Sequence, residues 1–215
     1  MKIMVVGDIH AEWGKFNELI NKKQPDIILQ CGDFGYWPSY KEYHPHHIKN
    51  DECKIYWCDG NHEEFSKLLT IKRHEIRPNI FYMKRGSTLI LPDGKIVLFM
   101  GGAESIDKHL RTPGIDWFLE EVITQKDFNN LPSEDTKIDI VISHTCPLEV
   151  DLGDKFKDRE PLKDCSRVAL SRILEMYKPS LWYFSHWHTY KEGFIQNCKW
   201  TCLNMSGRTG WWKWL

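Results

Sequence analysis

The sequence has no apolar run long enough to cross a lipid bilayer. A membrane-spanning helix needs about 20 mostly apolar residues, and no such stretch is present. The apolar residues at 3–6 end at Gly7-Asp8, too early for the core of a signal peptide. Repeats, low-complexity stretches and long linkers are also missing. We therefore expect a cytoplasmic protein without a membrane partner, with residues 1–215 forming a single domain.

An excess of charge of either sign is missing as well. The 29 Lys and Arg residues are balanced by 30 Asp and Glu residues, and the formal net charge is -1. A protein whose main task is to grip nucleic acid usually has a basic surface. The composition therefore provides no overall positive electrostatic field for binding nucleic acid, although it does not exclude a local basic patch.

The seven cysteines are an odd number, so complete pairing within the chain is excluded. Cys31, Cys58, Cys146 and Cys202 lie within or beside apolar runs, which is typical of reduced, buried thiols in cytosolic proteins. Cys198 and Cys202 are four residues apart and could form a metal pair. No second Cys pair has a matching spacing, so we favour the buried thiols.

Short apolar runs alternate with helical patterns along most of the chain. This alternation favours parallel strands in an α/β fold with mixed sheets and outer helices. Two hairpins are predicted at 88–100 and 194–203, and Thr112-Pro113 has the residue types of a helix start. The remaining pattern predicts strands at 3–6, 27–29, 54–57, 138–142 and 181–184, and helices at 14–23, 65–69 and 170–177.

Polar clusters follow five of these apolar runs directly. If the five runs are neighbouring parallel strands, every cluster lies at the carboxyl edge of one sheet, where open α/β sheets bind ligands. Glycines in the first three clusters let the backbone turn sharply there. The side chains of these clusters that can bind a metal are Asp8, His10, Asp33, Asn61, His144, His186 and His188.

Carboxylate oxygens and neutral imidazoles together suit Mn²⁺, Fe, Zn²⁺, Co²⁺ or Ni²⁺. Seven side chains exceed the needs of one ion, whereas two ions about 3.5–4 Å apart that share one carboxylate fit the number. Each cluster alone has an ordinary interpretation. Gly60-Asn61-His62-Glu63, for example, could begin a helix with Asn61 as its N-cap. All five clusters in order, each at a strand end, favour a metal centre.

The ordered set Gly7-Asp8-Ile9-His10, Gly32-Asp33, Gly60-Asn61-His62-Glu63, Ser143-His144 and His186-Trp187-His188 resembles the calcineurin-like metallophosphoesterases. The resemblance implies a two-sheet mixed β-sandwich flanked by helices. It implies a first metal bound by Asp8, His10, Asp33 and His188, and a second bound by Asp33, Asn61, His144 and His186. Asp33 would bridge the two ions, Mn²⁺ being the preferred metal, and His62 would be the acid beside the phosphate.

The sequence departs from the pattern of this family at several positions. Ala11 stands where the family usually has Gly, a change that we expect to be harmless because Ala fits most backbone conformations. Ser185 replaces the usual Gly before His186. The phosphoprotein phosphatases continue their second motif differently from residues 34–37 here. Residues 101–107 resemble small microbial and phage phosphoesterases, and also lariat-debranching enzymes, whose first-motif Cys is absent.

Three further groups of residues have two interpretations each. In the aromatic loop 34–47, Tyr36 and Trp37 could stack on a substrate base or pack on the body of the protein. Lys108, His109 and Arg111 could clamp a substrate phosphate or form a solvated basic turn. The tryptophans at 211, 212 and 214 could anchor the chain at a membrane interface, but packing on the body or at a dimer contact is favoured.

Together these features predict hydrolysis of a phosphate ester by metal-bound hydroxide. Asn61 and Asp33 would hold the phosphate and the ions, and His62 would protonate the leaving group. The preferred substrate is a small phosphodiester or a nucleotide, with nucleic acid as a related choice. The alternatives are a phosphomonoesterase, including a protein phosphatase, and a non-catalytic binding scaffold on the same fold.

Overall fold

The computed structural model describes residues 1–50, 52–153 and 164–215. Twelve strands, four α-helices and four short 3₁₀ helices are defined in these ranges. In chain order they are β1 (Ile3–Val6), α1 (Trp13–Lys23), β2 (Ile27–Gln30), η1 (Lys41–Tyr43), η2 (Pro45–His47), β3 (Lys54–Trp57), α2 (Phe65–Leu68), β4 (Glu75–Arg77), β5 (Ile80–Tyr82), β6 (Thr88–Ile90), β7 (Ile96–Met100), η3 (Lys108–Leu110), η4 (Leu119–Glu121), α3 (Gln125–Phe128), β8 (Ile140–Ser143), α4 (Cys165–Tyr177), β9 (Leu181–Phe184), β10 (Lys191–Ile195), β11 (Cys198–Cys202) and β12 (Trp212–Trp214).

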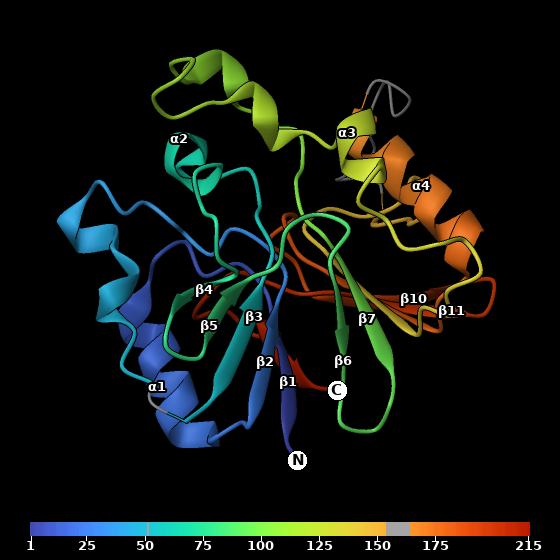
Figure 1. Cartoon of the computed structure of the whole chain (residues 1–215), viewed down its shortest axis with the longest axis horizontal. Helices are drawn as coiled ribbons and strands as arrows, with labels where there is room; N and C mark the ends of the chain where they lie inside the picture. Colours follow the sequence, from blue (N-terminus) through green and yellow to red (C-terminus); the bar gives the residue numbers. More distant parts are fainter. Residues whose placement is uncertain (51, 154–163) are drawn as a thin grey trace.

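The strands form two six-stranded sheets that face each other (Figure 1). The first sheet has the order β12-β1-β2-β3-β5-β4 and the second β10-β11-β9-β8-β7-β6. In each sheet the four central strands are parallel and the two edge strands are antiparallel. The predicted two-sheet mixed sandwich is therefore confirmed, whereas the single-domain assignment over residues 1–215 stays a prediction.

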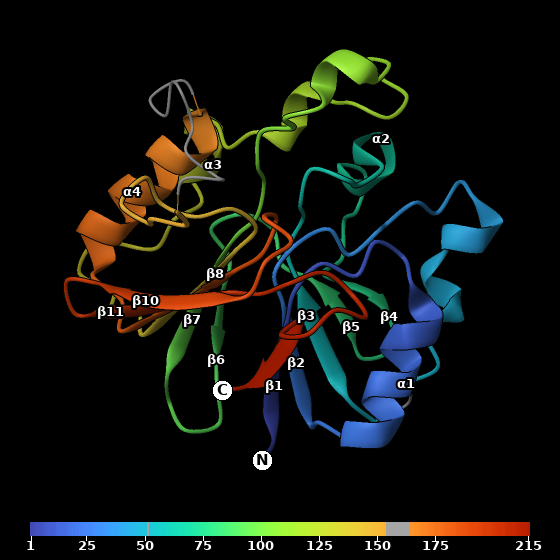
Figure 2. The same ribbon diagram turned by 180° about the vertical axis from the view of Figure 1, so that it is seen from behind.

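Apolar side chains on both faces of the central strands explain why the layers stack. Between the sheets, Val5 and Leu29 of the first sheet share a core with Val97, Phe99 and other residues of the second. The outer face of the first sheet packs against α1, and that of the second packs against α4. Figure 2 shows the two helices on opposite sides of the sandwich. Burial on both faces accounts for the near-continuous apolar runs of these strands.

Most of the predicted elements are confirmed, including both hairpins and the helices at 14–23, 65–69 and 170–177. The helix start at Thr112-Pro113 is wrong. Gly114 has a φ of +77°, which a right-handed helix cannot contain, and a turn closes at 112–117 instead. The short strands β4, β5 and β12 were not predicted.

The single-sheet arrangement of the five polar clusters is also wrong. β1, β2 and β3 lie in the first sheet, but β8 and β9 lie in the second. The chain leaves the first sheet after β5 and enters the second through the hairpin β6–β7. An alternation of strands and helices predicts parallel pairing but does not reveal such a change of sheet. The clusters therefore meet where the carboxyl ends of two sheets come together (Figure 1).

The predicted tolerance of Ala11 is contradicted by its backbone. Ala11 has a φ of +56°, in the left-handed region that Gly adopts without cost and Ala does not. Ser185 is not among the residues with positive φ, and its buried hydroxyl donates to the carbonyl oxygen of Cys31 at 2.7 Å. Ser therefore suits its position, whereas Ala11 is strained.

The C-terminal tryptophans contribute to the body of the protein, as favoured from the sequence. β12 pairs with β1, and Trp211 and Trp212 pack against the core beside α1. The ammonium of Lys23 lies 4.7 Å from the centre of the Trp212 ring. In the described ranges, no helix has the length and apolar character needed to cross a membrane.

A buried ion pair joins the end of β3 to the segment between β5 and β6. Arg85 lies 2.9 Å (Nε) and 2.6 Å (Nη2) from Asp59 Oδ2, and the Tyr82 hydroxyl donates to Asp59 Oδ1 at 3.0 Å. The Arg85 guanidinium also donates to the backbone carbonyls of residues 120–122. Arg85 thus holds η4 against the end of β3.

We expect Arg85→Met to lower the free energy of unfolding by about 3–5 kcal/mol, because Asp59 would stay buried without its cation. Adding Asp59→Asn should recover part of this loss, since a neutral amide needs no counter-charge. Urea unfolding monitored by circular dichroism measures both effects. Lys95→Met, which removes an exposed ion pair with Asp93, is the matched control and should leave stability unchanged. Equal losses for the two Met variants would contradict the assignment.

Candidate metal centre

The seven predicted ligands all lie in the turns that leave β1, β2, β3, β8 and β9. These turns meet at the junction of the two sheets, below the segment 104–121 (Figure 1). Four of the ligands have a left-handed backbone, a conformation that costs about 1–3 kcal/mol and concentrates at functional sites. They are His10 (φ +49°), Asp33 (+50°), His186 (+70°) and His188 (+45°).

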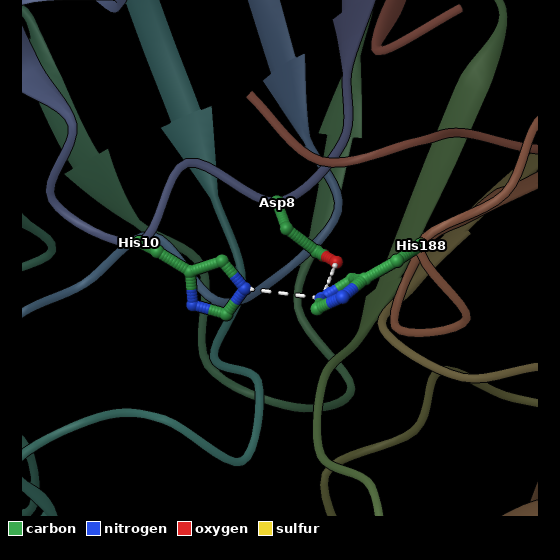
Figure 3. Close-up of side chains that lie close together, drawn as sticks. All are labelled: Asp8, His10 and His188. Atoms are coloured by element: carbon green, nitrogen blue, oxygen red, sulfur yellow. Dashed lines mark hydrogen bonds and ion pairs between the residues drawn. The ribbon is translucent and has the colours of Figure 1, made fainter. Parts of the chain in front are cut away.

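Asp8, His10 and His188 form the first group of converging ligand atoms (Figure 3). His188 Nε2 lies 3.1 Å from Asp8 Oδ2 and 3.2 Å from His10 Nε2. Asp33 Oδ2 lies 3.7 Å from His10 Nε2. Two carboxylate oxygens and two imidazole nitrogens therefore face one small region, as a divalent cation requires.

Asp33, His144 and Asn61 form a second group. The Cys31 carbonyl can only accept, so His144 Nδ1, 2.8 Å away, carries the proton. The other nitrogen of a neutral His144, Nε2, is then an acceptor, and it lies 3.3 Å from Asp33 Oδ2 and 3.0 Å from Asn61 Oδ1. Three acceptors pointing at one another in a dry site suit a cation.

Asp33 Oδ2 thus faces a ligand nitrogen of both groups, His10 Nε2 and His144 Nε2. Asp8 belongs to both groups of converging His and carboxylate atoms in the described residues. Its close contact with His144, at 3.6 Å, is however with the Nδ1 that donates to Cys31. The free nitrogen of His144 points to Asp33. The oxygen best able to serve two ions is therefore that of Asp33.

His186 contacts the second group through its ring, whose centre is 4.9 Å from that of His144. Its backbone N–H lies 3.2 Å from both carboxylate oxygens of Asp8. His186 belongs to neither group of converging His and carboxylate atoms in the described residues. Burial and the neighbouring His144 lower the pKa of His186 to about 3, so its ring is neutral and can donate a lone pair to a metal.

The charges of this cluster depend on one another. Burial opposes ionisation of both Asp8 and Asp33, but nearby histidines outweigh it, so both pKa values fall below the ordinary range. At Asp8 these histidines are His188 and His144. At Asp33 they are His144, His62 and His10. Burial likewise opposes protonation of His144, but Asp33 and Asp8 raise its pKa to about 9. Without a metal, a proton on His144 takes the place of a cation among the carboxylates. The donor set therefore fits divalent cations.

Two glycines allow the ligands to approach this closely. A Cβ on Gly60 would lie 2.1 Å from Asp33 Oδ1, and a Cβ on Gly32 would lie 2.5 Å from His144 Nδ1. Both distances are below contact, so any other residue would displace a ligand. The glycines predicted for sharp turns thus also provide space for the carboxylate and the imidazole.

His62 lies beside the first group, with its ring centre 5.3 Å from that of His10. Its backbone N–H donates to Asp33 Oδ1 at 2.8 Å. Arg111 Nη2 lies 2.6 Å from His62 Nε2 and, because a guanidinium can only donate, this nitrogen of His62 accepts. Burial and Arg111 lower the pKa of His62 despite the charge of Asp33, so His62 is neutral in this state.

The other predicted substrate contacts lie in different surroundings. Tyr36 packs against Trp57 with ring centres 5.6 Å apart, and Trp37 donates from Nε1 to the His62 carbonyl at 2.9 Å. Both contacts match the alternative in which the loop packs on the body. His109 is exposed on η3, and the neighbouring Lys108 is paired with Glu104. Arg111 is the predicted basic residue that reaches the ligand cluster.

Several residues at the site were missed by the sequence interpretation. The buried carboxylate of Glu63 accepts the backbone N–H groups of residues 34 and 35 at 2.8 and 3.1 Å, which shapes the turn after Asp33. Its place in the Gly-Asn-His-Glu motif was the available signal. Ser105, which accepts from Asn61, and Glu121, which accepts from Ser105, were not predicted as partners of a ligand.

Comparison with known proteins gives a family for the chain. The family model described as calcineurin-like phosphoesterase matches residues 1–190. A lariat debranching enzyme of Schizosaccharomyces pombe (strain 972 / ATCC 24843) is 26% identical over an alignment of 223 residues, which covers 88% of this chain and 48% of the relative. The chain thus spans about half the length of this curated relative.

Solved structures share the fold at low sequence identity. The phosphopantetheinyl hydrolase of Mycobacterium tuberculosis has a TM-score of 0.57 at 12% identity, covering all of this chain and 95% of the other. GAP50, the anchor in the inner membrane complex of Plasmodium, has a TM-score of 0.55 at 11% identity, covering 94% and 70%. These likenesses concern the fold, whereas the family model rests on the sequence. The chain therefore belongs to the calcineurin-like phosphoesterase family.

Proposed function

We propose that this protein is a two-metal phosphoesterase whose preferred substrate is a small phosphodiester or a nucleotide. The observation that carries the proposal is the position of Asp33 Oδ2, which lies 3.7 Å from His10 Nε2 and 3.3 Å from His144 Nε2. The first ion would be held by Asp8, His10, Asp33 and His188, and the second by Asp33, Asn61, His144 and His186. We expect Mn²⁺, with Fe, Zn²⁺, Co²⁺ or Ni²⁺ as alternatives, and a cytoplasmic location.

When bound, two divalent cations lower the pKa of a coordinated water and neutralise phosphoryl oxygens. The residues of the chain supply orientation and proton transfer. The side chain of His188 is 40% exposed and that of His10 23%, whereas that of His144 is completely buried. We expect the phosphate to enter from the side of His10 and His188, because the second group is closed to solvent.

Arg111 and His62 would act in sequence at this entrance. In the structure the Arg111 guanidinium donates to His62 Nε2. A phosphate dianion or monoanion is a stronger acceptor for a guanidinium than a neutral imidazole. We expect the substrate to draw Arg111 away from His62, which frees Nε2 to take up a proton from solvent and give it to the leaving oxygen.

The name of the curated relative bears on the substrate class. It is named a lariat debranching enzyme, and this supports a nucleotide or nucleic acid as the substrate class. A phosphomonoesterase, including a protein phosphatase, is the second candidate, since the same ligand set can serve either ester. A non-catalytic scaffold is the third. One fold neighbour is described as an anchor, but this chain keeps every predicted ligand and His62.

A substrate screen with the purified, Mn²⁺-loaded protein tests the proposed function. It compares p-nitrophenyl phosphate, bis-p-nitrophenyl phosphate, cyclic nucleotides and short RNA. Hydrolysis of the diesters in preference to the monoester supports the proposal. Preference for the monoester would favour the second candidate, and no turnover of any ester by metal-loaded protein would favour the scaffold.

Asp33→Asn should abolish hydrolysis and weaken the binding of both ions, because it removes the charge that both would share. Isothermal titration with Mn²⁺ and elemental analysis should give two ions per chain for the unaltered protein. Asp93→Asn, an exposed carboxylate in the β6–β7 turn, is the matched control and should behave like the unaltered protein. One ion or none in the folded, Mn²⁺-loaded protein would sink the two-metal proposal.

His62→Ala should slow hydrolysis by about 10²–10⁴-fold and leave the metal content unchanged, since His62 is expected to act as an acid and not as a ligand. The loss should shrink for p-nitrophenyl esters, whose leaving group needs no proton. His74→Ala, an imidazole that contacts the Tyr82 carbonyl instead, is the control. Equal losses for p-nitrophenyl and alkyl esters would argue against the acid role.

The acid limit of activity should move to lower pH as free Mn²⁺ increases. Because the pKa of His144 is raised to about 9, metal must displace a proton from this residue at neutral pH. The same raised pKa stabilises the metal-free fold below the unfolded pKa of about 6.5, and this contribution is lost as the pH rises through about 9. The metal-free protein should therefore lose stability over that window.

Rate profiles against pH at several buffered Mn²⁺ concentrations measure the first effect, and thermal unfolding with chelator at pH 6.5 and 9 measures the second. An acid limit that stays fixed while metal occupancy changes would count against the histidines as ligands.

A further inference from the structure

A buried chain of hydrogen bonds leads from the segment 104–121 to the predicted ligand Asn61. Asn61 Nδ2 donates to Ser105 Oγ at 3.0 Å, and the Ser105 hydroxyl donates to Glu121 Oε2. The three residues are 2%, 2% and 1% exposed. A polar chain of this kind in a dry site has to satisfy every donor and acceptor, so its directions are determined.

The direction of each hydrogen bond follows from what Glu121 accepts. Its Oε1 already accepts the Phe118 backbone N–H at 3.1 Å. Burial raises the pKa of the Glu121 carboxyl to about 7, and above that pH the ionised carboxylate can only accept. Ser105 has a single hydrogen, which goes to Glu121, so its oxygen can only accept from the third partner. Asn61 must therefore turn its NH₂ group toward Ser105.

This direction decides which atom of Asn61 faces the metal centre. The oxygen and nitrogen of an amide have nearly the same shape, so the amide can be reversed unless its surroundings prevent it. With the NH₂ group on Ser105, Oδ1 points to His144 Nε2 at 3.0 Å. The reversed amide would aim hydrogens at the position of the second ion and could not ligate it.

Glu121 is itself held firmly from other directions. Its backbone carbonyl accepts from Arg85 Nη2 at 3.1 Å and from the Ala103 backbone N–H at 3.0 Å. Arg111 Nη1 lies 3.8 Å from Glu121 Oε1, and the same guanidinium contacts His62. Glu121 thus connects to both neighbours of the motif, Asn61 through Ser105 and His62 through Arg111.

We propose that Ser105 and Glu121 are positioning residues that hold the Asn61 amide with its oxygen toward His144 and the second ion. The metal-binding part of this inference rests on the proposed function. Hydrogen-bond partners of this kind typically change metal affinity or activity by about 10–100-fold when they are removed. They act through Asn61 and need no contact with the substrate.

The test is a double-mutant cycle read out by Mn²⁺ titration of the metal-free, full-length chain, at a pH above the Glu121 pKa of about 7. Ser105→Ala should weaken one of the two Mn²⁺ sites by about 10–100-fold and leave the other unchanged. In an Asn61→Ala background, Ser105→Ala should have no further effect, because it acts only through the amide. Glu121→Gln should resemble Ser105→Ala, since the amide of the new Gln side chain can donate to Ser105 and so reverse the direction of the hydrogen bonds to Asn61.

Ser166→Ala is the matched control, because Ser166 is an equally buried serine whose hydroxyl accepts from Ile123 and not from a ligand. It should leave both Mn²⁺ sites unchanged. The hydrogen bond from Asn61 to Ser105 is also tested, without metal or activity, through the side-chain amide protons of Asn61 by NMR. These should exchange slowly with solvent in the unaltered protein and quickly in Ser105→Ala.

The outcomes separate the two proposals. Unaltered protein with two Mn²⁺ sites, together with a Ser105→Ala variant of normal affinity and slow amide exchange, would overturn the positioning role alone. An effect of Ser105→Ala that persists in the Asn61→Ala background would show a general structural role instead and would also overturn it. Unaltered protein that binds fewer than two ions would overturn the proposed function and the metal-positioning role, even if the Asn61 amide is protected.

Discussion

Two carboxylates, Asp8 and Asp33, are almost completely buried side by side at the junction of the sheets, and the rest of the structure has to compensate for them. Isolated buried charges are very costly in a medium of low dielectric constant. Imidazoles from three different turns face these carboxylates, and backbone N–H groups of His62 and His186 point at them as well. The cluster is an assembly of acceptors that a proton or a metal cation completes.

The surrounding fold is organised to bring these groups together in spite of local strain. Four ligands have a left-handed backbone, and Gly32 and Gly60 leave no space for a Cβ beside the ligand atoms. The carboxylate of Glu63 and the Arg85–Asp59 pair hold the turns that carry the ligands. Such strain persists only where the packing around it is strong, and here two sheets and two helices supply that packing.

The two halves of the cluster differ in access to solvent. His188 and His10 are partly exposed, whereas His144 and Asn61 are buried beneath the segment that carries Ser105, Arg111 and Glu121. This segment therefore contacts the buried half through Asn61 and the open half through His62.

The sequence by itself predicted the candidate ligands, and it determined their positions at strand ends, because glycine-flanked polar residues follow five apolar runs in order. The sequence also predicted the two-sheet sandwich through the family resemblance, and most helices and strands through the spacing of apolar residues. It could not reveal that β8 and β9 belong to a second sheet, since parallel pairing has the same local pattern in one sheet or two. Nor could it reveal the left-handed Ala11, or the pairing of Ser105 and Glu121 with Asn61, because backbone φ and contacts 44 and 16 residues apart arise only when the layers pack.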